Sequence, residues 1–127
     1  MIVKIPVSLG ELIDKISILL IKEKNISDEK KLSKIQEELS LLKKTLNHRI
    51  NDNNIKNYLN KLVEINAKLW KIEDDIRDCE RNNKFDKIFI DLARSVYITN
   101  DKRSEIKNEI NKKFSSKIVE VKSYKKY

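Results

Sequence analysis

Apolar side chains recur at helical spacing over most of the chain, and four segments carry the pattern. The first predicted helix covers residues 9–24, where LGELIDKISILLIKEK places leucines and isoleucines on one broad face. The second covers residues 28–47 and the third and fourth cover residues 54–81 and 85–114. The links between these segments are short. The sequence therefore predicts one domain, residues 1–127, folded as an all-α antiparallel helical bundle of about four helices.

The second predicted helix has a narrower apolar face than the first. Its leucines and isoleucine repeat with the alternating spacing of a coiled-coil seam, at Leu32, Ile35, Leu39, Leu42 and Leu46. Such a seam packs well against a single partner helix, which can belong to this chain or to another one.

Residues at the segment ends refine the boundaries. Ser8 is a predicted N-cap because Ser8 and Glu11 have capping-box spacing, and Ser27 is the predicted N-cap of the second helix. The segment IVKIPV before Ser8 favours extended backbone because of its β-branched residues and its proline. The basic tail, residues 115–127, contains IVEV, which predicts a short strand beside residues 2–5. We therefore expect short extended N- and C-terminal segments around the bundle.

Composition supports helices and excludes several classes of protein. One Gly and one Pro in 127 residues are too few for the turns of an all-β or α/β fold. The single cysteine, Cys79, cannot form an intramolecular disulfide and fits a reducing compartment. The N-terminus lacks the apolar stretch of a signal peptide, and no apolar run approaches the length of a membrane span. We expect a cytoplasmic protein with no membrane span.

Basic residues outnumber acidic residues by 28 to 20, which gives a formal net charge of +8. Six lysines and one acid, Glu120, lie in residues 112–127, so +5 of this charge belongs to the tail. Elsewhere lysines alternate with acids, and only five of the 28 basic residues are arginines. Nucleic-acid binding usually needs a basic face with arginine and aromatic partners. The charge pattern therefore favours a solvated surface with a basic tail over a nucleic-acid binder.

Two polar residues interrupt the apolar stripe of the fourth predicted helix. The stripe consists of Phe85, Phe89, Leu92, Val96, Thr99, Arg103, Ile106 and Ile110. Thr99 and Arg103 thus occupy positions where the helical pattern predicts core side chains. A buried arginine needs partners, because removing an unpaired charge from water costs several kcal/mol.

The third predicted helix has a polar face that can supply such partners. Asn66, Trp70, Glu73 and Arg77 share this face, and Asp74 lies beside it. Counting back from the turn at residues 82–84 places Arg103 opposite residues 62–66. We therefore expect Asn66 to be the neighbour of Arg103, and Arg94 or Tyr97 to be the neighbour of Glu73.

Two interpretations of this polar centre stay open. It can be a structural ion-pair network that fixes the helix register. It can also be a pocket for an anion or a sugar, in which arginine binds a carboxylate or phosphate and Trp70 stacks on a ring. On the first helix, Asp14 either faces inward or acts as a first-turn acid beside the helix dipole. The candidate ligand-binding residues are Asn66, Trp70, Glu73, Asp74, Arg77, Asn100, Asp101, Arg103 and Lys107.

Several motifs carry a resemblance to known sequences. SLGELIDKISIL, LWKIEDDIRDCE, ARSVYITNDKRSEIKNEI and SKIVEVKSY resemble an uncharacterised bacterial domain-of-unknown-function family of short helical proteins. The resemblance covers the N-terminal segment and residues from about 62 onward, and its matching positions comprise every candidate residue except Asn66, together with Leu69 and Asn111. The L-W-x-x-E-D and N-D motifs are also similar to a second uncharacterised helical family. Members of the first family are often encoded near lipopolysaccharide and glycosyltransferase genes, which implies a role in envelope polysaccharide assembly.

The residues give little support to other chemistries. The only histidine, His48, lies in a polar turn and Cys79 has no companion at ligand spacing, so we expect no metal site. One glycine excludes the P-loop and the dinucleotide-binding fingerprint, and we expect no cofactor. Catalysis by electrostatics and shape, as in the all-helical chorismate mutases, stays open, and so does the question whether the protein is an enzyme.

Three functions follow from these observations. The first is an accessory or binding domain for envelope polysaccharide assembly, with a polar pocket between helices for an anionic sugar or nucleotide sugar. The second is a non-catalytic module whose leucine seam forms a homo-oligomer or docks on a partner glycosyltransferase. The third is a nucleic-acid binder. Ligand-dependent stabilisation would favour the first, self-association the second, and a steep salt dependence of polynucleotide binding the third.

Overall fold

The computed structural model describes residues 1–127 and contains four α-helices and no β-strand. They are α1 (Leu9–Asn25), α2 (Glu29–Arg49), α3 (Asn53–Arg81) and α4 (Lys87–Lys113). The predicted all-α fold is confirmed, and each predicted boundary lies within two residues of the observed one.

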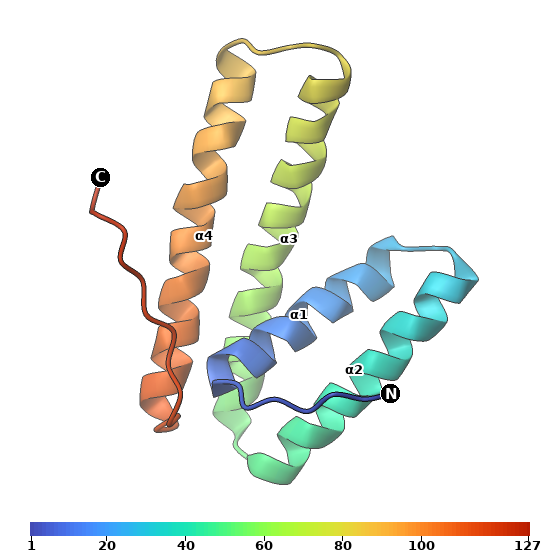
Figure 1. The fold of residues 1–127 in the computed structure, drawn as a ribbon, viewed down its shortest axis with the longest axis vertical. Helices are drawn as coiled ribbons and strands as arrows, with labels where there is room; N and C mark the ends of the chain where they lie inside the picture. The colour runs from blue at the N-terminus through green and yellow to red at the C-terminus, as the bar shows by residue number, and fades with distance from the viewer.

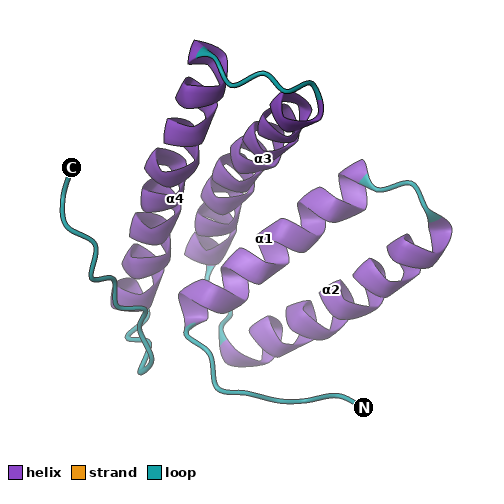
Figure 2. Cartoon of the chain, turned by 45° about the horizontal axis from the view of Figure 1, so that its top comes forward, coloured by secondary structure: helices purple, strands orange, loops and turns teal.

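The helices form two antiparallel hairpins that meet along α1 (Figure 1). α1 packs against the three other helices and α3 packs against α4, whereas α2 packs only against α1. Figures 1 and 2 show that α1 diverges from α3 as it runs towards the α1–α2 turn, while the α3–α4 hairpin extends beyond it. One half of the α3–α4 hairpin is therefore left uncovered by the other two helices.

The core is built around α1. Ile13 and Ile16 are fully buried, and Leu62 of α3 and Ile110 of α4 complete the centre of the same apolar cluster. The seam of α2 lies in this cluster too, through Ile35, Leu39 and Leu46. The short link between α1 and α2 folds the seam back onto α1, so these side chains pack within the chain.

The N-caps follow the predicted chemistry with one correction. Ser8 caps α1, because its Oγ accepts a hydrogen bond from the Glu11 amide over 3.1 Å. The cap of α2 is Asp28 rather than Ser27, and its carboxylate accepts from the Lys31 amide over 2.9 Å. The positive end of the helix dipole also stabilises the negative charge of a carboxylate, whereas a serine hydroxyl carries no such charge.

α4 begins later than the stripe of apolar residues predicts. Asp86 is its N-cap and accepts from the amides of Ile88 and Phe89. Phe85 consequently lies in the turn between α3 and α4, where half of its surface is exposed. Phe85 is therefore not a core residue, although its place in the apolar stripe predicted that it would be one.

The single glycine marks the closest approach of two helices. A Cβ atom on Gly10 would lie 2.5 Å from the backbone oxygen of Lys107 and 3.0 Å from Oδ1 of Asn111. The space is used by a hydrogen bond of 2.7 Å from the Gly10 amide to the same Asn111 oxygen. Nearby, the Leu9 amide donates to Ser116 Oγ over 3.2 Å. The start of α1 is thus clamped to the end of α4.

The two ends of the chain do not pair. Residues 1–8 and 117–127 contain no strand, and Figure 1 shows that they leave the helices on opposite sides of the molecule. The predicted strand in the tail is therefore wrong, because its backbone has no neighbouring strand to bond. No helix of the chain has the length and apolarity required to cross a bilayer.

We predict that Gly10→Ala destabilises the protein. In an open helix this change should stabilise by about 1 kcal/mol, because alanine has the higher helix propensity. Here the added methyl group would push α1 away from α4, and such overpacking costs about 1–3 kcal/mol. Urea unfolding measures the sign of the change in the free energy of unfolding directly. A variant more stable than the parent would show that the two helices separate without cost.

Candidate functional site

A buried carboxylate lies where α1, α3 and α4 meet. Asp14 is only 2% exposed, and Asn66 of α3 donates from Nδ2 to its Oδ1 over 2.8 Å. The same Nδ2 donates to Ser17 Oγ over 2.8 Å, and Ser17 Oγ donates to the backbone oxygen of Asp14. Asp14 therefore faces inward, and its contacts fix the register of α1 against α3.

Arg103 of α4 reaches this cluster but is only partly engaged by it. Its Nη1 donates to Asn66 Oδ1 over 3.5 Å, and its Nε lies 3.8 Å from Asp14 Oδ1. The predicted neighbourhood of Arg103 and Asn66 is therefore present. Both distances are long for hydrogen bonds from a charged donor, which are usually about 2.7–2.9 Å when the acceptor is charged too. The side chain is also 27% exposed, so most of its five N–H donors remain available.

A groove of about 510 Å³ lies beside Arg103, where α1 diverges from α3. Its volume is within the range of about 300–1,000 Å³ that is typical of ligand pockets. Seven of the nine candidate residues line it: Asn66, Trp70, Glu73, Asp74, Arg77, Asn100 and Arg103. The rest of the wall is Ile18, Ile21, Lys22, Leu69 and Val96. We call this cavity the Trp70 groove.

Charges of both signs line the Trp70 groove. Arg77 donates to Glu73 on its own helix, and Glu73 makes no hydrogen bond or ion pair with Arg94 or Tyr97 across the hairpin. Three cations, Lys22, Arg77 and Arg103, line the groove with two carboxylates, Glu73 and Asp74, and the buried Asp14 carboxylate beside Arg103 balances the third positive charge. The groove therefore offers N–H donors to an anion and carboxylate oxygens that accept hydrogen bonds from hydroxyl groups.

Lys107 is one of the two candidate residues outside the groove. Its side chain is 5% exposed and its Nζ lies 2.7 Å from Glu11 and 3.0 Å from Glu120. Burial alone would lower the pKa of Lys107, but its hydrogen bonds to Glu11 and Glu120 outweigh burial and raise that pKa above its ordinary value. The ammonium joins α1, α4 and the tail.

The tail supplies a second ion pair at the same place. Glu120 contacts Lys122 at 2.7 Å as well as Lys107 at 3.0 Å. Hydrogen bonds from Lys122 and then Lys107 lower the pKa of Glu120 to about 2. Lys107 therefore holds the tail against α4 as long as Glu120 is ionised, whereas the pair with Lys122 lies within the tail.

Asp101, the other candidate outside the Trp70 groove, faces the tail. The hydroxyl of Tyr127 donates to its Oδ2 over 2.5 Å. This hydrogen bond raises the pKa of Tyr127 to about 12, because the ionised phenol would be repelled by the carboxylate. The sequence grouped Asp101 with the groove residues, whereas the structure places it on the next face of α4.

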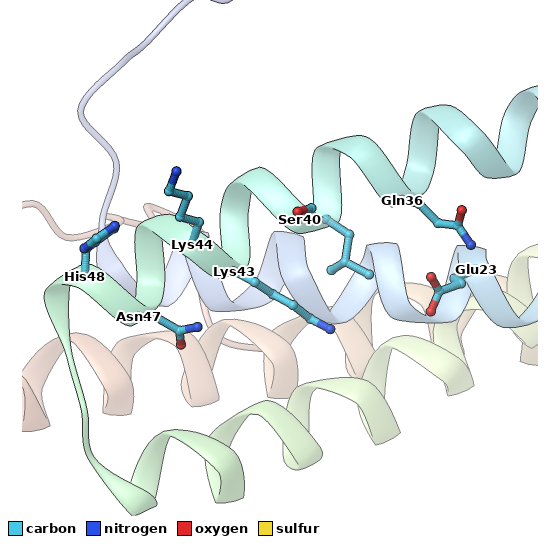
Figure 3. A pocket seen from close by; sticks show the side chains of 8 residues that line it. Glu23, Gln36, Ser40, Lys43, Lys44, Asn47 and His48 are labelled. Atoms are coloured by element: carbon cyan, nitrogen blue, oxygen red, sulfur yellow. The ribbon is translucent and has the colours of Figure 1, made fainter.

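Another hollow lies between α1 and α2, and its side chains form no comparable cluster of charged and aromatic groups. It is lined by polar side chains and one apolar residue, Leu39. Figure 3 shows Lys44 and His48 pointing away from the α1 side, and only Glu23 and Gln36 lying near each other. Its side chains do not converge on a common point.

Several residues of the centre escaped the sequence analysis. Ser17 is buried in polar contacts between helices, and Gly10 makes the close approach to α4 and donates to Asn111. The only signal was their residue type, since a small polar residue and the one glycine stand in the first helix among apolar residues. Their partners lie about 50 to 100 positions away, where helical spacing gives no information.

The chain matches a protein-family model over residues 3–127, described as a family of unknown function (DUF6165). The chain belongs to the DUF6165 family. The predicted membership of an uncharacterised domain family is thus confirmed. No curated protein and no solved structure matches the chain. The DUF6165 match includes the Asp14–Asn66–Arg103 centre, the Trp70 groove and the tail, so all three belong to the family's domain.

We predict that Asn66→Ala destabilises this DUF6165 protein by about 3 kcal/mol. The change leaves the carboxylate of Asp14 buried without its best donor, and breaking a buried charged contact costs about 3–5 kcal/mol. Urea unfolding measures the loss. Asn60→Ala is the matched control, because Asn60 lies on the same helix and is exposed. Equal effects of the two changes would contradict a structural role for the Asn66 amide.

We predict that the docked tail weakens as the pH falls from about 4.5 towards 2. A carboxyl with a lowered folded-state pKa stabilises the fold above its unfolded-state value and loses that contribution as it is protonated. Carboxyl NMR of Glu120 should give a pKa of about 2. In Lys122→Met that pKa should rise, because the largest cause of the shift is removed. An unchanged pKa would mean that Glu120 is not held by Lys122.

Proposed function

We propose that this DUF6165 protein is a binding domain for a small anionic carbohydrate, such as a sugar acid, a phosphosugar or a nucleotide sugar, in the Trp70 groove. One observation carries the proposal. Arg103 is anchored at the groove by Asn66 and Asp14 through long contacts and keeps most of its donors free. An anchored guanidinium with free donors is suited to a planar carboxylate or to a phosphate.

The other groove residues fit the remaining parts of such a ligand. Trp70 offers an aromatic face for a sugar ring or a base. Asn100 makes no side-chain hydrogen bond within the protein and can bind hydroxyl groups. Asp74 can accept further hydroxyl hydrogen bonds, and Lys22 adds a second positive charge near Arg103. The proposal assigns binding to the groove and no reaction.

The cellular setting is a proposal as well. The motifs resemble those of chains expected near lipopolysaccharide and glycosyltransferase genes, and on this ground we propose that the ligand belongs to envelope polysaccharide assembly. The cytoplasm fits this setting, since a nucleotide sugar is a soluble precursor and Cys79 is a free thiol.

A second candidate function is docking, either on another copy of the chain or on a glycosyltransferase. The observation that favours it is three exposed apolar side chains near the α3–α4 turn, Phe85, Ile88 and Ile90, each more than half exposed. Exposed apolar side chains gathered at one end of a protein are available for contacts with another protein. With the α2 seam buried, this turn is the surface on which docking would depend.

The proposed function predicts a fluorescence response, because Trp70 is the only tryptophan of the chain. Titration with glucuronic acid, glucose 1-phosphate and a uridine diphosphate sugar should change the Trp70 emission and raise the urea midpoint. Arg103→Gln should weaken binding by roughly 10- to 100-fold, the usual worth of a lost charged contact.

Arg94→Gln is the matched control for this experiment. It removes the same charge from the same helix, at an exposed position outside the groove. If the two substitutions weaken binding equally, the groove is not the binding site. If no anionic sugar alters the emission while the protein self-associates through Phe85 and Ile88, the docking function replaces the binding function.

A further inference from the structure

The tail forms a second groove on α4 beside the Trp70 groove. Residues after Glu120 run back along α4, as the red segment in Figure 1 shows, and border an open groove of about 730 Å³ against it, which we call the tail groove. Glu120 and Lys107 hold one end of this segment, and Tyr127 and Asp101 hold the other. The tail groove is therefore a walled space with two fixed ends.

The floor of the tail groove is a row of uncharged polar side chains. Asn100, Ser104 and Asn108 follow one another at single-turn spacing on α4 and line the groove. Each is half-buried, and none makes a side-chain hydrogen bond within the protein. Half-buried amides and hydroxyls without protein partners are available for ligand hydroxyl groups.

Tyrosines form the walls of the same groove. Tyr97 of α4 and Tyr127 of the tail meet edge to face, with ring centroids 5.4 Å apart, and Tyr124 lies beside them. An aromatic face next to amide and hydroxyl groups suits a sugar ring, which has an apolar face and hydroxyl edges.

The charges of the tail groove argue against a polyphosphate or a nucleic acid as its occupant. Lys122, Lys125 and Lys126 line it, but Asp101 and Glu105 lie on the opposite wall. Lys122 is already engaged with Glu120. The carboxylates would repel a run of phosphates, whereas a neutral sugar can donate its hydroxyls to them.

Asn100 connects the two grooves, because it lines both of them. We propose that the tail groove is a second carbohydrate subsite and that the ligand is an acidic oligosaccharide. Its acidic sugar occupies the Trp70 groove beside Arg103, and a neutral sugar follows across Asn100 into the tail groove. This inference rests on the proposed function and names the class of its ligand.

The test is a series of glycans of increasing length. Alternating oligosaccharides of glucuronic acid and N-acetylglucosamine, from one sugar to four, are titrated into the full chain and followed by Trp70 fluorescence and calorimetry. The dissociation constant should fall roughly tenfold once the oligosaccharide is long enough to reach the tail groove, because the added sugar contributes a stacked ring and hydrogen bonds.

Two substitutions should remove this gain and leave glucuronic acid binding intact. Tyr97→Ala deletes a wall of the tail groove and Asn108→Ala deletes part of its floor, and neither residue lines the Trp70 groove. Asn60→Ala, on an exposed face of α3, is the control that should change nothing. The helical circular dichroism of each variant confirms that it is folded.

The outcomes separate this inference from the proposed function. If glucuronic acid binds but longer oligosaccharides bind no better, the tail subsite is wrong and the proposed function stands. The same conclusion follows if longer oligosaccharides bind better both to the parent protein and to Tyr97→Ala. If none of the sugars binds, both are wrong. If an oligouridylate binds instead, with a steep salt dependence that Lys125→Gln reduces, the tail binds phosphates and the carbohydrate subsite is overturned.

Discussion

Burial of the Asp14 carboxylate determines how three of the four helices sit against one another. An ion in an apolar interior costs several kcal/mol unless hydrogen bonds satisfy it. Asn66 meets this need with both ends of its amide, since Nδ2 donates to Asp14 and Ser17 while Oδ1 accepts from Arg103. A slip of one residue along α3 would turn Asn66 by roughly 100° and lose all three contacts. Apolar packing alone tolerates such a slip better, so the amide specifies the register.

The clamp at Gly10 then explains why a groove exists at all. The start of α1 touches the backbone of α4 so closely that only a glycine fits, and Asn111 and Ser116 bond to its first amides. No equivalent contact holds the other end of α1, which diverges from α3 (Figures 1 and 2). Helix α1 is therefore held near its start, to α4 at Gly10 and to α3 at Asp14, and its separation from α3 beyond these contacts leaves a wedge. The Trp70 groove lies in that wedge, directly above the Asp14 cluster on α1, so its position follows from the polar contacts below it.

Helical spacing was sufficient to predict the elements and most of the groove. The four helices could be read from apolar repeats, and Asn66, Trp70 and Arg77 from their shared polar face, because these relations are local in sequence. Contacts between distant segments could not be read in this way. Lys107 looked like a groove residue, but its partner Glu11 lies 96 positions away, and this contact holds Lys107 at the clamp between α1 and α4 instead. The strand expected in the tail failed for the same reason, since strand formation depends on a neighbour that the local pattern does not reveal.

The contrast between Arg103 and Lys107 distinguishes scaffold from candidate site. The two cations are one turn apart on α4 and both face carboxylates of α1. Lys107 is enclosed and has two short contacts, which is how a charge that serves stability is satisfied. Arg103 has two long contacts, a partly exposed side chain and free donors on the wall of a groove. A network optimised for stability alone would shorten those contacts or replace the arginine by an apolar residue, since a loosely paired charge contributes little. The incomplete pairing of Arg103 therefore supports a role in which the missing partner is a ligand.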